Sequence, residues 1–183
     1  MKKRILTWLL AISMLGSLLT VPAGAAAVTK FSDVSDSYTA TAVEALRLMG
    51  VLDGYGDGTF RPDTVLNRAQ FCKMAVYAMD GSGELGRYST VTIFPDVKPS
   101  HWASAYINMA ARKGIISGFA DGKFKPGQTV TAGQAVTILM RGLGYKDEDM
   151  GGVWPQSYMA EAQTNGLLKS TGITSAYAGL TRA

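Results

Sequence analysis

The stretch that decides the fold is "DGYGDGTFRPDTVLNRAQF", residues 53–71, which returns sixty-four positions later as "SGFADGKFKPGQTVTAGQA", residues 117–135. The two copies share six identical residues, which in the first copy are Gly54, Asp57, Gly58, Phe60, Pro62 and Gln70. One position changes character, because Arg68 is replaced by Ala132 in the second copy. A recurrence of this kind predicts a repeat protein in which each copy is one supersecondary unit.

The last residues of the stretch predict the start of a helix. In "NRAQ", Asn67 suits the N-cap position and the side chain of Gln70 can reach back to the Asn67 backbone N–H. Thr131 and Gln134 repeat this capping box in the second copy. "LTRA", residues 180–183, begins a third copy, so the third unit is expected to lack its second helix within this sequence.

Another helix is predicted before each copy. In the first unit, Val43, Leu46 and Met49 fall at helical spacing and Gly50 is placed to end the helix. The second and third units repeat this pattern at an offset of fifty-two residues. The matched pairs are Trp102 with Trp154, Tyr106 with Tyr158, Ala110 with Ala162 and Gly114 with Gly166.

These patterns predict a mainly α fold of helix–turn–helix repeats around a pseudo-threefold three-helix bundle, with little or no strand. Two helices per unit cannot bury their apolar faces alone, whereas three units around one axis can. The expected segments are a signal peptide at 1–27, a first repeat at 28–80, a Gly/Ser-rich linker at 81–92, a second repeat at 93–144 and a partial third repeat at 145–183.

The first residues have the three parts of a secretory signal. "MKKR" is basic, residues 5–19 are uncharged and apolar, and "TVPAGAAA" offers small residues for cleavage. The apolar run is short for a membrane span, so no membrane contact is expected after cleavage. Removing 1–27 leaves 15 basic and 14 acidic residues, a net charge of +1. No basic stripe remains that would indicate a nucleic-acid partner.

No catalytic or metal-binding constellation is evident. Cys72 is the only cysteine, and its counterpart Val136 indicates a small buried hydrophobe. His101 is the only histidine and has no second histidine or cysteine near it in the sequence. We therefore predict no catalytic residues, no metal and no cofactor for this segment.

The glycine-rich turn allows a calcium-binding alternative of the dockerin type. Asp53, Asp57 and Gly58 match the first, fifth and sixth positions of an EF-hand loop. The third position is Tyr55, however, and the twelfth is Thr64, where calcium needs a carboxylate. A folding turn fits better, with Gly54, Gly56 and Gly58 permitting positive φ and with Phe60 and Phe124 as buried anchors.

Arg68 and Arg182 occupy the first helical position after a cap that does not itself require an arginine. A guanidinium beside free backbone amides would form a pocket for a carboxylate or phosphate. A solvated surface arginine is the equal alternative. On the first hypothesis, Arg68→Ala should weaken binding and leave stability nearly unchanged, and Ala132 marks a unit that has lost its binding residue.

The combination of "FSDV" and "FPDV", "HWASAY", "GIISG", "DGxFxP" and the capped second helix resembles S-layer homology repeats, strongly in two units and weakly in the third. The resemblance implies a secreted protein of the Gram-positive cell wall or S-layer. It also implies grooves between repeats that bind secondary cell-wall polysaccharide, often carrying a pyruvate ketal and linked to peptidoglycan. The family motif Thr-Arg-Ala-Glu becomes Asn67-Arg68-Ala69-Gln70 here, loses its arginine at Ala132, and returns at Thr181-Arg182-Ala183.

The resemblance implies polysaccharide-binding roles for six residues, which are Arg68, Arg182, Trp102, Trp154, Asp33 and Asp96. For the tryptophans, packing at the start of the first helix is an equal alternative to stacking on sugar. For the aspartates, capping of the first turn is the alternative to facing the glycan. The expected function is surface anchoring, with self-association in a surface layer also open. A dockerin-like module, or the anchor of a larger surface enzyme or lattice protein continuing past residue 183, remains the alternative.

Overall fold

The computed structural model of the chain describes residues 30–79, 82–169 and 171–183. The predicted signal peptide at 1–27 lies outside the described residues. Within the part of the chain that is described, no helix is long and apolar enough to cross a membrane.

Helices dominate the described chain, as the repeat pattern predicts. The first helices of the three repeats are α2 (Ser37–Leu48), α4 (Ser104–Arg112) and α6 (Gln156–Thr164). The second helices of the first two repeats are α3 (Arg68–Ala78) and α5 (Ala132–Gly142). Two short 3₁₀ helices are η1 (Ser82–Tyr88) and η2 (Asp147–Asp149). Extended pairing in the described ranges consists of isolated bridges. The prediction of a mainly α fold is confirmed.

The helix ends form where the sequence indicates. Both predicted capping boxes are present, at Asn67 for α3 and at Thr131 for α5. The three glycines that follow the first helices have positive φ values, of 72° at Gly50, 70° at Gly114 and 75° at Gly166. This left-handed conformation ends a helix at little steric cost only when the residue is glycine.

The three repeats meet in a closed ring of backbone hydrogen bonds. Leu66 N–H donates to the Leu180 carbonyl (2.8 Å), Val130 N–H to that of Leu66 (3.0 Å), and Leu180 N–H to that of Val130 (3.2 Å). These residues occupy the same position, just before the cap, in successive repeats. The ring places the third repeat beside the first and gives the molecule its pseudo-threefold arrangement.

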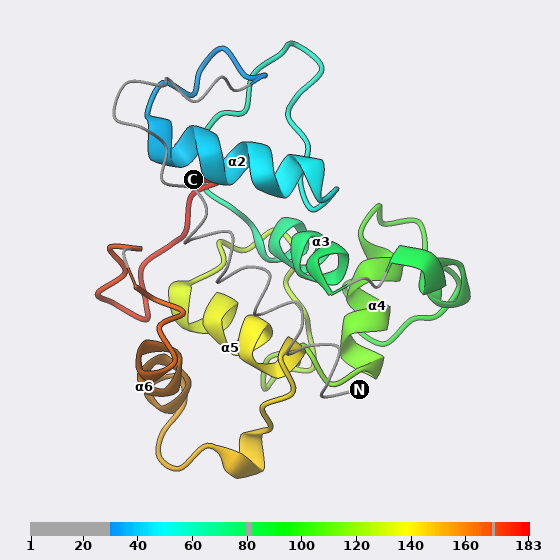
Figure 1. The fold of residues 1–183 in the computed structure, drawn as a ribbon. Coiled ribbons are helices and arrows are strands. Elements are labelled where there is room, and N and C mark those ends of the chain that lie inside the picture. The colour runs from blue at the N-terminus through cyan, green and yellow to red at the C-terminus, as the bar shows by residue number, and fades with distance from the viewer. Residues whose placement is uncertain (1–29, 80–81, 170) are drawn as a thin grey trace.

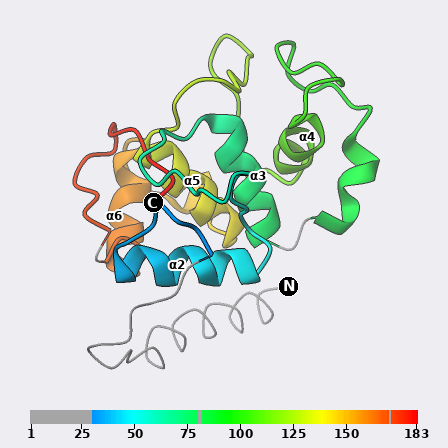
Figure 2. The same cartoon turned by 90° about the horizontal axis from the view of Figure 1, so that it is seen from above.

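The helices pack in the order that this ring imposes (Figures 1 and 2). Helices α3 and α5 lie side by side in the middle, α4 packs against α3, and α6 packs against α5. The expected linker contains η1, which packs against α4 and is therefore part of the folded domain. Helix α2 forms a separate hydrophobic cluster with Phe31 and Phe60, and the partly buried Met74 of α3 packs against this cluster.

Burial agrees with most of the predicted core positions. Val43 is buried in α2, and Cys72 is fully buried, which raises the pKa of its thiol to about 12 and keeps it unreactive. Met49 falls at the same helical spacing, but its side chain is 45% exposed. It is the C-cap of α2, at the point where the chain leaves the helix.

Candidate functional site

The recurring turn is a buried folding element, as predicted for its phenylalanines. Phe60 and Phe124 are completely buried, and each packs on the phenylalanine that opens its repeat, Phe31 or Phe94, at 5.5 Å between ring centroids. Of the three glycines predicted to permit positive φ, Gly58 adopts it (81°), whereas Gly54 and Gly56 do not. A Cβ at position 54 would overlap the ring of Phe31, so close packing requires this glycine.

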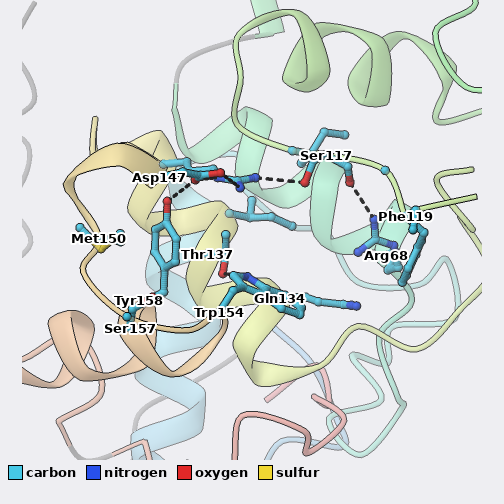
Figure 3. Close-up of a pocket in the computed structure, with 16 residues that line it drawn as sticks. Arg68, Ser117, Phe119, Gln134, Thr137, Asp147, Met150, Trp154, Ser157 and Tyr158 are labelled. Atoms are coloured by element: carbon cyan, nitrogen blue, oxygen red, sulfur yellow. Dashed lines mark hydrogen bonds and ion pairs between the residues drawn. The ribbon is translucent and has the colours of Figure 1, made fainter. Parts of the chain in front are cut away.

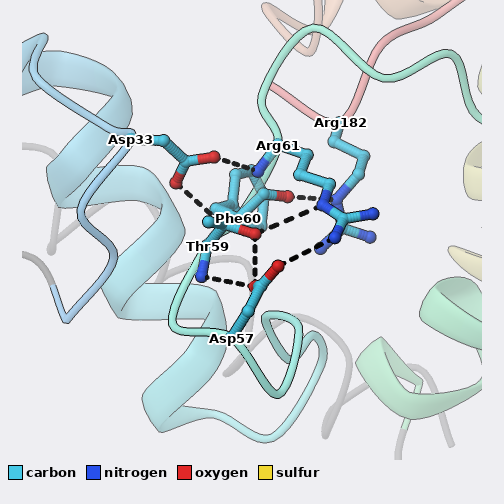
Figure 4. A network of polar contacts seen from close by, with 6 residues as sticks. All are labelled: Asp33, Asp57, Thr59, Phe60, Arg61 and Arg182. Atoms are coloured by element: carbon cyan, nitrogen blue, oxygen red, sulfur yellow. Dashed lines mark hydrogen bonds and ion pairs between the residues drawn. The ribbon is translucent and has the colours of Figure 1, made fainter.

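Asp33 holds the turn of the first repeat by hydrogen bonds to its backbone (Figure 4). Its carboxylate accepts from the N–H of Phe60 (2.7 Å) and of Arg61 (2.6 Å). These bonds, the one from Phe60 foremost, hold the pKa of Asp33 below its usual value. The N-cap of α2 is Asp36, so Asp33 does not cap that helix.

Asp96 repeats this arrangement in the second repeat. Its carboxylate accepts from the N–H of Phe124 (2.9 Å) and of Lys125 (2.7 Å). Partial burial opposes ionisation, but these amides still hold the pKa of Asp96 below its usual value. Neither Asp96 nor Asp33 lines the pockets described below. Their role as polysaccharide ligands stays a prediction.

Asp57, central to the calcium alternative, makes contacts typical of a turn. Its carboxylate accepts from the N–H and hydroxyl of Thr59 and from the Arg61 guanidinium at 2.9 Å (Figure 4). In the described parts of the chain, no three His, Cys, Asp or Glu side chains are grouped so that they could hold a metal ion.

Arg68 crosses from the first repeat into the turn of the second. Its Nε donates to the Phe124 carbonyl (2.8 Å) and its Nη2 to the Ser117 carbonyl (3.4 Å). The guanidinium also lies over the rings of Phe119 and Phe124, at 4.7 and 4.5 Å from their centroids. Arg68 is only 5% exposed, so the alternative of a solvated surface arginine is wrong.

Arg182 makes the equivalent contacts from the third repeat to the turn of the first (Figure 4). Its Nε donates to the Phe60 carbonyl (2.8 Å) and its Nη2 to the Asp53 carbonyl (2.9 Å). The guanidinium lies over the rings of Phe60 and Tyr55, at 4.4 and 5.2 Å. The two arginines therefore join successive repeats in the same way.

The backbone amides beside Arg68 are not free, which corrects part of the predicted pocket. Arg68 N–H donates to the Gln128 carbonyl (2.9 Å) and Ala69 N–H to the Pro126 carbonyl (3.1 Å). The turn of the next repeat thus occupies the donors that an anion would need. Any ligand here must be bound by side chains.

The change to Ala132 has a structural correlate. Ala132 N–H donates to the Ala178 carbonyl, so this position faces the turn of the third repeat. That segment, "GITSAYAGL" (172–180), contains no phenylalanine to accept a guanidinium. The second repeat lacks the arginine at the position that faces a turn without the phenylalanine present in the other two turns.

A pocket of about 410 Å³, which we call the Trp154 pocket, lies between the repeats (Figure 3). Arg68 comes from the first repeat, Phe119 and Gln134 from the second and Trp154 from the third. Trp154 is 52% exposed and its indole N–H donates to Thr137 at 3.0 Å. The indole therefore lines the pocket, and its stacking on sugar stays a prediction.

A second pocket of about 250 Å³, the Trp102 pocket, is built from equivalent positions. Arg182, Tyr55, Gln70 and Trp102 take the places of Arg68, Phe119, Gln134 and Trp154. Trp102 is 55% exposed. The fold thus pairs each predicted arginine with one predicted tryptophan from a different repeat.

Each pocket is lined by two basic residues and one acidic residue, which are Arg68, Arg141 and Asp147 in the Trp154 pocket and Arg182, Lys73 and Asp53 in the Trp102 pocket. Arg68 and Arg182 form no salt bridge with any carboxylate of the described residues. Each guanidinium has five N–H donors and directs two of them to carbonyls, so others remain for an anionic ligand. Lys73 adds a cation to the Trp102 pocket.

Several pocket residues were not predicted from the sequence. Gln70 and Gln134 were assigned only to capping, and the aromatic side chains of Tyr55 and Phe119 only to the turn. Their shared offset of sixty-four residues was the available signal. Arg141, which lines the Trp154 pocket, has Tyr77 as its counterpart and therefore gave no repeat signal.

Comparison with known proteins identifies the repeats. The model of the S-layer homology domain matches residues 30–72 and 93–136, which are the first two repeats. The chain is therefore a protein with S-layer homology domains, and this family places it at the cell surface.

Three curated relatives illustrate the range of proteins that contain this region. A cell surface protein of Thermoanaerobacter kivui is 38% identical over 86% of this chain and 20% of its own length. A surface layer protein of Brevibacillus choshinensis is 32% identical over 86% of this chain and 14% of its own length. An uncharacterized cell wall amidase of Bacillus anthracis is 29% identical over 93% of this chain and 33% of its own length. The chain thus spans a third or less of each of these relatives.

Proposed function

We propose that this chain is a noncatalytic anchoring module that binds acidic secondary cell-wall polysaccharide in the Trp154 and Trp102 pockets. One observation carries the proposal: both pockets combine an arginine without a carboxylate partner and a half-exposed tryptophan. A guanidinium binds carboxylates with directed hydrogen bonds, and an indole offers an apolar face to a sugar ring. A polysaccharide carrying a pyruvate ketal would supply both groups.

Two pockets on one chain favour retention on a polymer. Once one pocket holds the polysaccharide, the second binds at a high effective concentration, so weak sites give firm attachment. The names of the surface layer and cell surface relatives support the anchoring role.

A second candidate is an anchoring segment within a larger surface enzyme. The cell wall amidase among the relatives supports it. Both candidates assign the same binding role to the residues described here. They are distinguished by sequencing the full gene past the codon for Ala183, where the second candidate predicts a catalytic domain and the first does not.

The binding role is tested by sedimenting the chain with purified cell walls, before and after removal of the secondary polysaccharide. We expect retention only on intact walls. Trp102→Ala and Trp154→Ala should each weaken retention, and the double variant should weaken it by about a hundredfold or more because avidity is lost. Leu48→Ala is the matched control, since Leu48 is 72% exposed and lines neither pocket. Equal retention on stripped walls would refute the proposal.

A further inference from the structure

The Trp154 pocket contains a second arginine, and a carboxylate of the chain itself occupies it. Arg141 of α5 donates through Nε and Nη2 to both oxygens of Asp147 in η2, at 2.8 and 2.7 Å. The hydroxyl of Tyr158 donates to the same carboxylate (Figure 3). This is the bidentate geometry with which an arginine binds the carboxylate of a ligand.

Arg141 belongs to the wall of the pocket, whereas Asp147 approaches it from a surface segment. The Arg141 side chain is 12% exposed and that of Asp147 is 66% exposed. Arg141 Nη1 also donates to the Ser117 hydroxyl (3.3 Å), and Arg68 contacts the carbonyl of the same residue. The two guanidinium groups thus meet on Ser117, within reach of one ligand.

The junction between the first two repeats shows that the fold does not need this charge pair. The positions of Arg141 and Tyr158 are held at that junction by Tyr77 and Tyr106, whose hydroxyl groups lie 3.2 Å apart. Two neutral side chains therefore close the same junction between the second helix and the next repeat. A structural requirement alone does not explain a partly buried arginine paired with an exposed carboxylate at the equivalent place.

We propose that Arg141 is a second anion-binding subsite of the Trp154 pocket and that Asp147 is its built-in competitor. A carboxylate of an acidic sugar displaces Asp147, takes over the bidentate bonds to Arg141 and accepts from Tyr158. The internal carboxylate lowers the affinity of this pocket and excludes ligands that lack a negative charge. This inference rests on the proposed polysaccharide function, because it assumes that the pocket binds an acidic sugar.

The test uses the chain with a methyl hexoside that carries a 4,6-linked pyruvate ketal as the probe. The arginine Nε–H signals are followed by ¹H–¹⁵N NMR and assigned with Arg68→Lys, Arg141→Lys and Arg182→Lys. In Asp147→Asn, the Arg141 signal should titrate at a probe concentration about 1.5 to 5 times lower than in the wild type, the range expected for one partly exposed ion pair. Asp149→Asn is the matched control, because Asp149 lies in the same η2 segment, causes the same change in net charge and forms no salt bridge with Arg141.

The signals separate this inference from the proposed function. If the Arg68 signal responds in all variants and the Arg141 signal titrates equally in the wild type and in Asp147→Asn, the competitor role is refuted and the binding role stands. An equal gain in Asp149→Asn would refute it too, since net charge would then be the cause. If neither the Arg68 nor the Arg182 signal responds, the proposed function itself fails. Asp147→Ala should reproduce the gain of Asp147→Asn, and a gain in only one of the two would contradict displacement.

Discussion

Replacing Arg68 by alanine tests whether this side chain holds the repeats together as well as lining a pocket. The sequence suggested that the variant would keep its stability, because the helix cap does not need an arginine. In the folded chain, Arg68 donates to the carbonyls of Phe124 and Ser117 and lies over two aromatic rings of the second repeat. We therefore expect a clear loss of stability.

The size of the loss follows from these contacts. A hydrogen bond from a charged donor contributes about 1.5–3 kcal/mol, and the bond to Phe124 at 2.8 Å is the strong one. The contacts with the rings add about 0.5–2 kcal/mol. A total of about 3 kcal/mol corresponds to a fall in Tm of about 6–12 °C for a domain of this size.

Thermal unfolding followed by circular dichroism measures this effect. Arg87→Ala is the matched control, because it removes the same charge from a side chain that is 80% exposed and contacts only Glu84, at 3.8 Å. We expect its Tm to stay within about 1 °C of the wild type, as for most surface substitutions. An Arg68→Ala Tm as close to the wild type as that of the control would refute the structural role.

Two further predictions concern the turn. The pKa values of Asp33 and Asp96 are lowered in the folded chain. The two carboxylates therefore contribute to folding stability above the pKa of the unfolded chain, about 3.8, and this contribution is lost as the pH falls through the lower pKa values of the folded chain. Urea unfolding of the Asp33→Asn/Asp96→Asn double variant should show lower stability than the wild type at pH 6. Its stability should then fall less than that of the wild type between pH 6 and pH 3, and an equal fall in both proteins would contradict this prediction. Gly54→Ala should cost about 1–3 kcal/mol because of the overlap with Phe31, whereas Gly56→Ala, with open space around position 56, should be close to neutral in the same measurement. Equal stability of the two glycine variants would show that the turn tolerates a side chain at position 54.

Local signals in the sequence predicted much of the fold. The capping boxes at Asn67 and Thr131, the glycine helix ends and the buried Phe60 and Phe124 all depend on residues close to one another in the chain. Arg68 was selected as a functional candidate for a similar reason, since its position relative to the cap is visible in one repeat. Its contacts could not be predicted, because they are made with residues about fifty positions away.

The sequence by itself determined the repeat, its helices and turns, and the identity of the arginines and tryptophans that line the pockets. Only the tertiary structure decided which arginine joins which tryptophan, because each pocket draws on three repeats brought together by the ring of Leu66, Val130 and Leu180. The difference between the two pockets was equally invisible in the repeat pattern. The carboxylate of Asp147 comes from the η2 segment at the start of the third repeat, where no counterpart in the other repeats marks it, and it reaches the pocket only when the chain is folded.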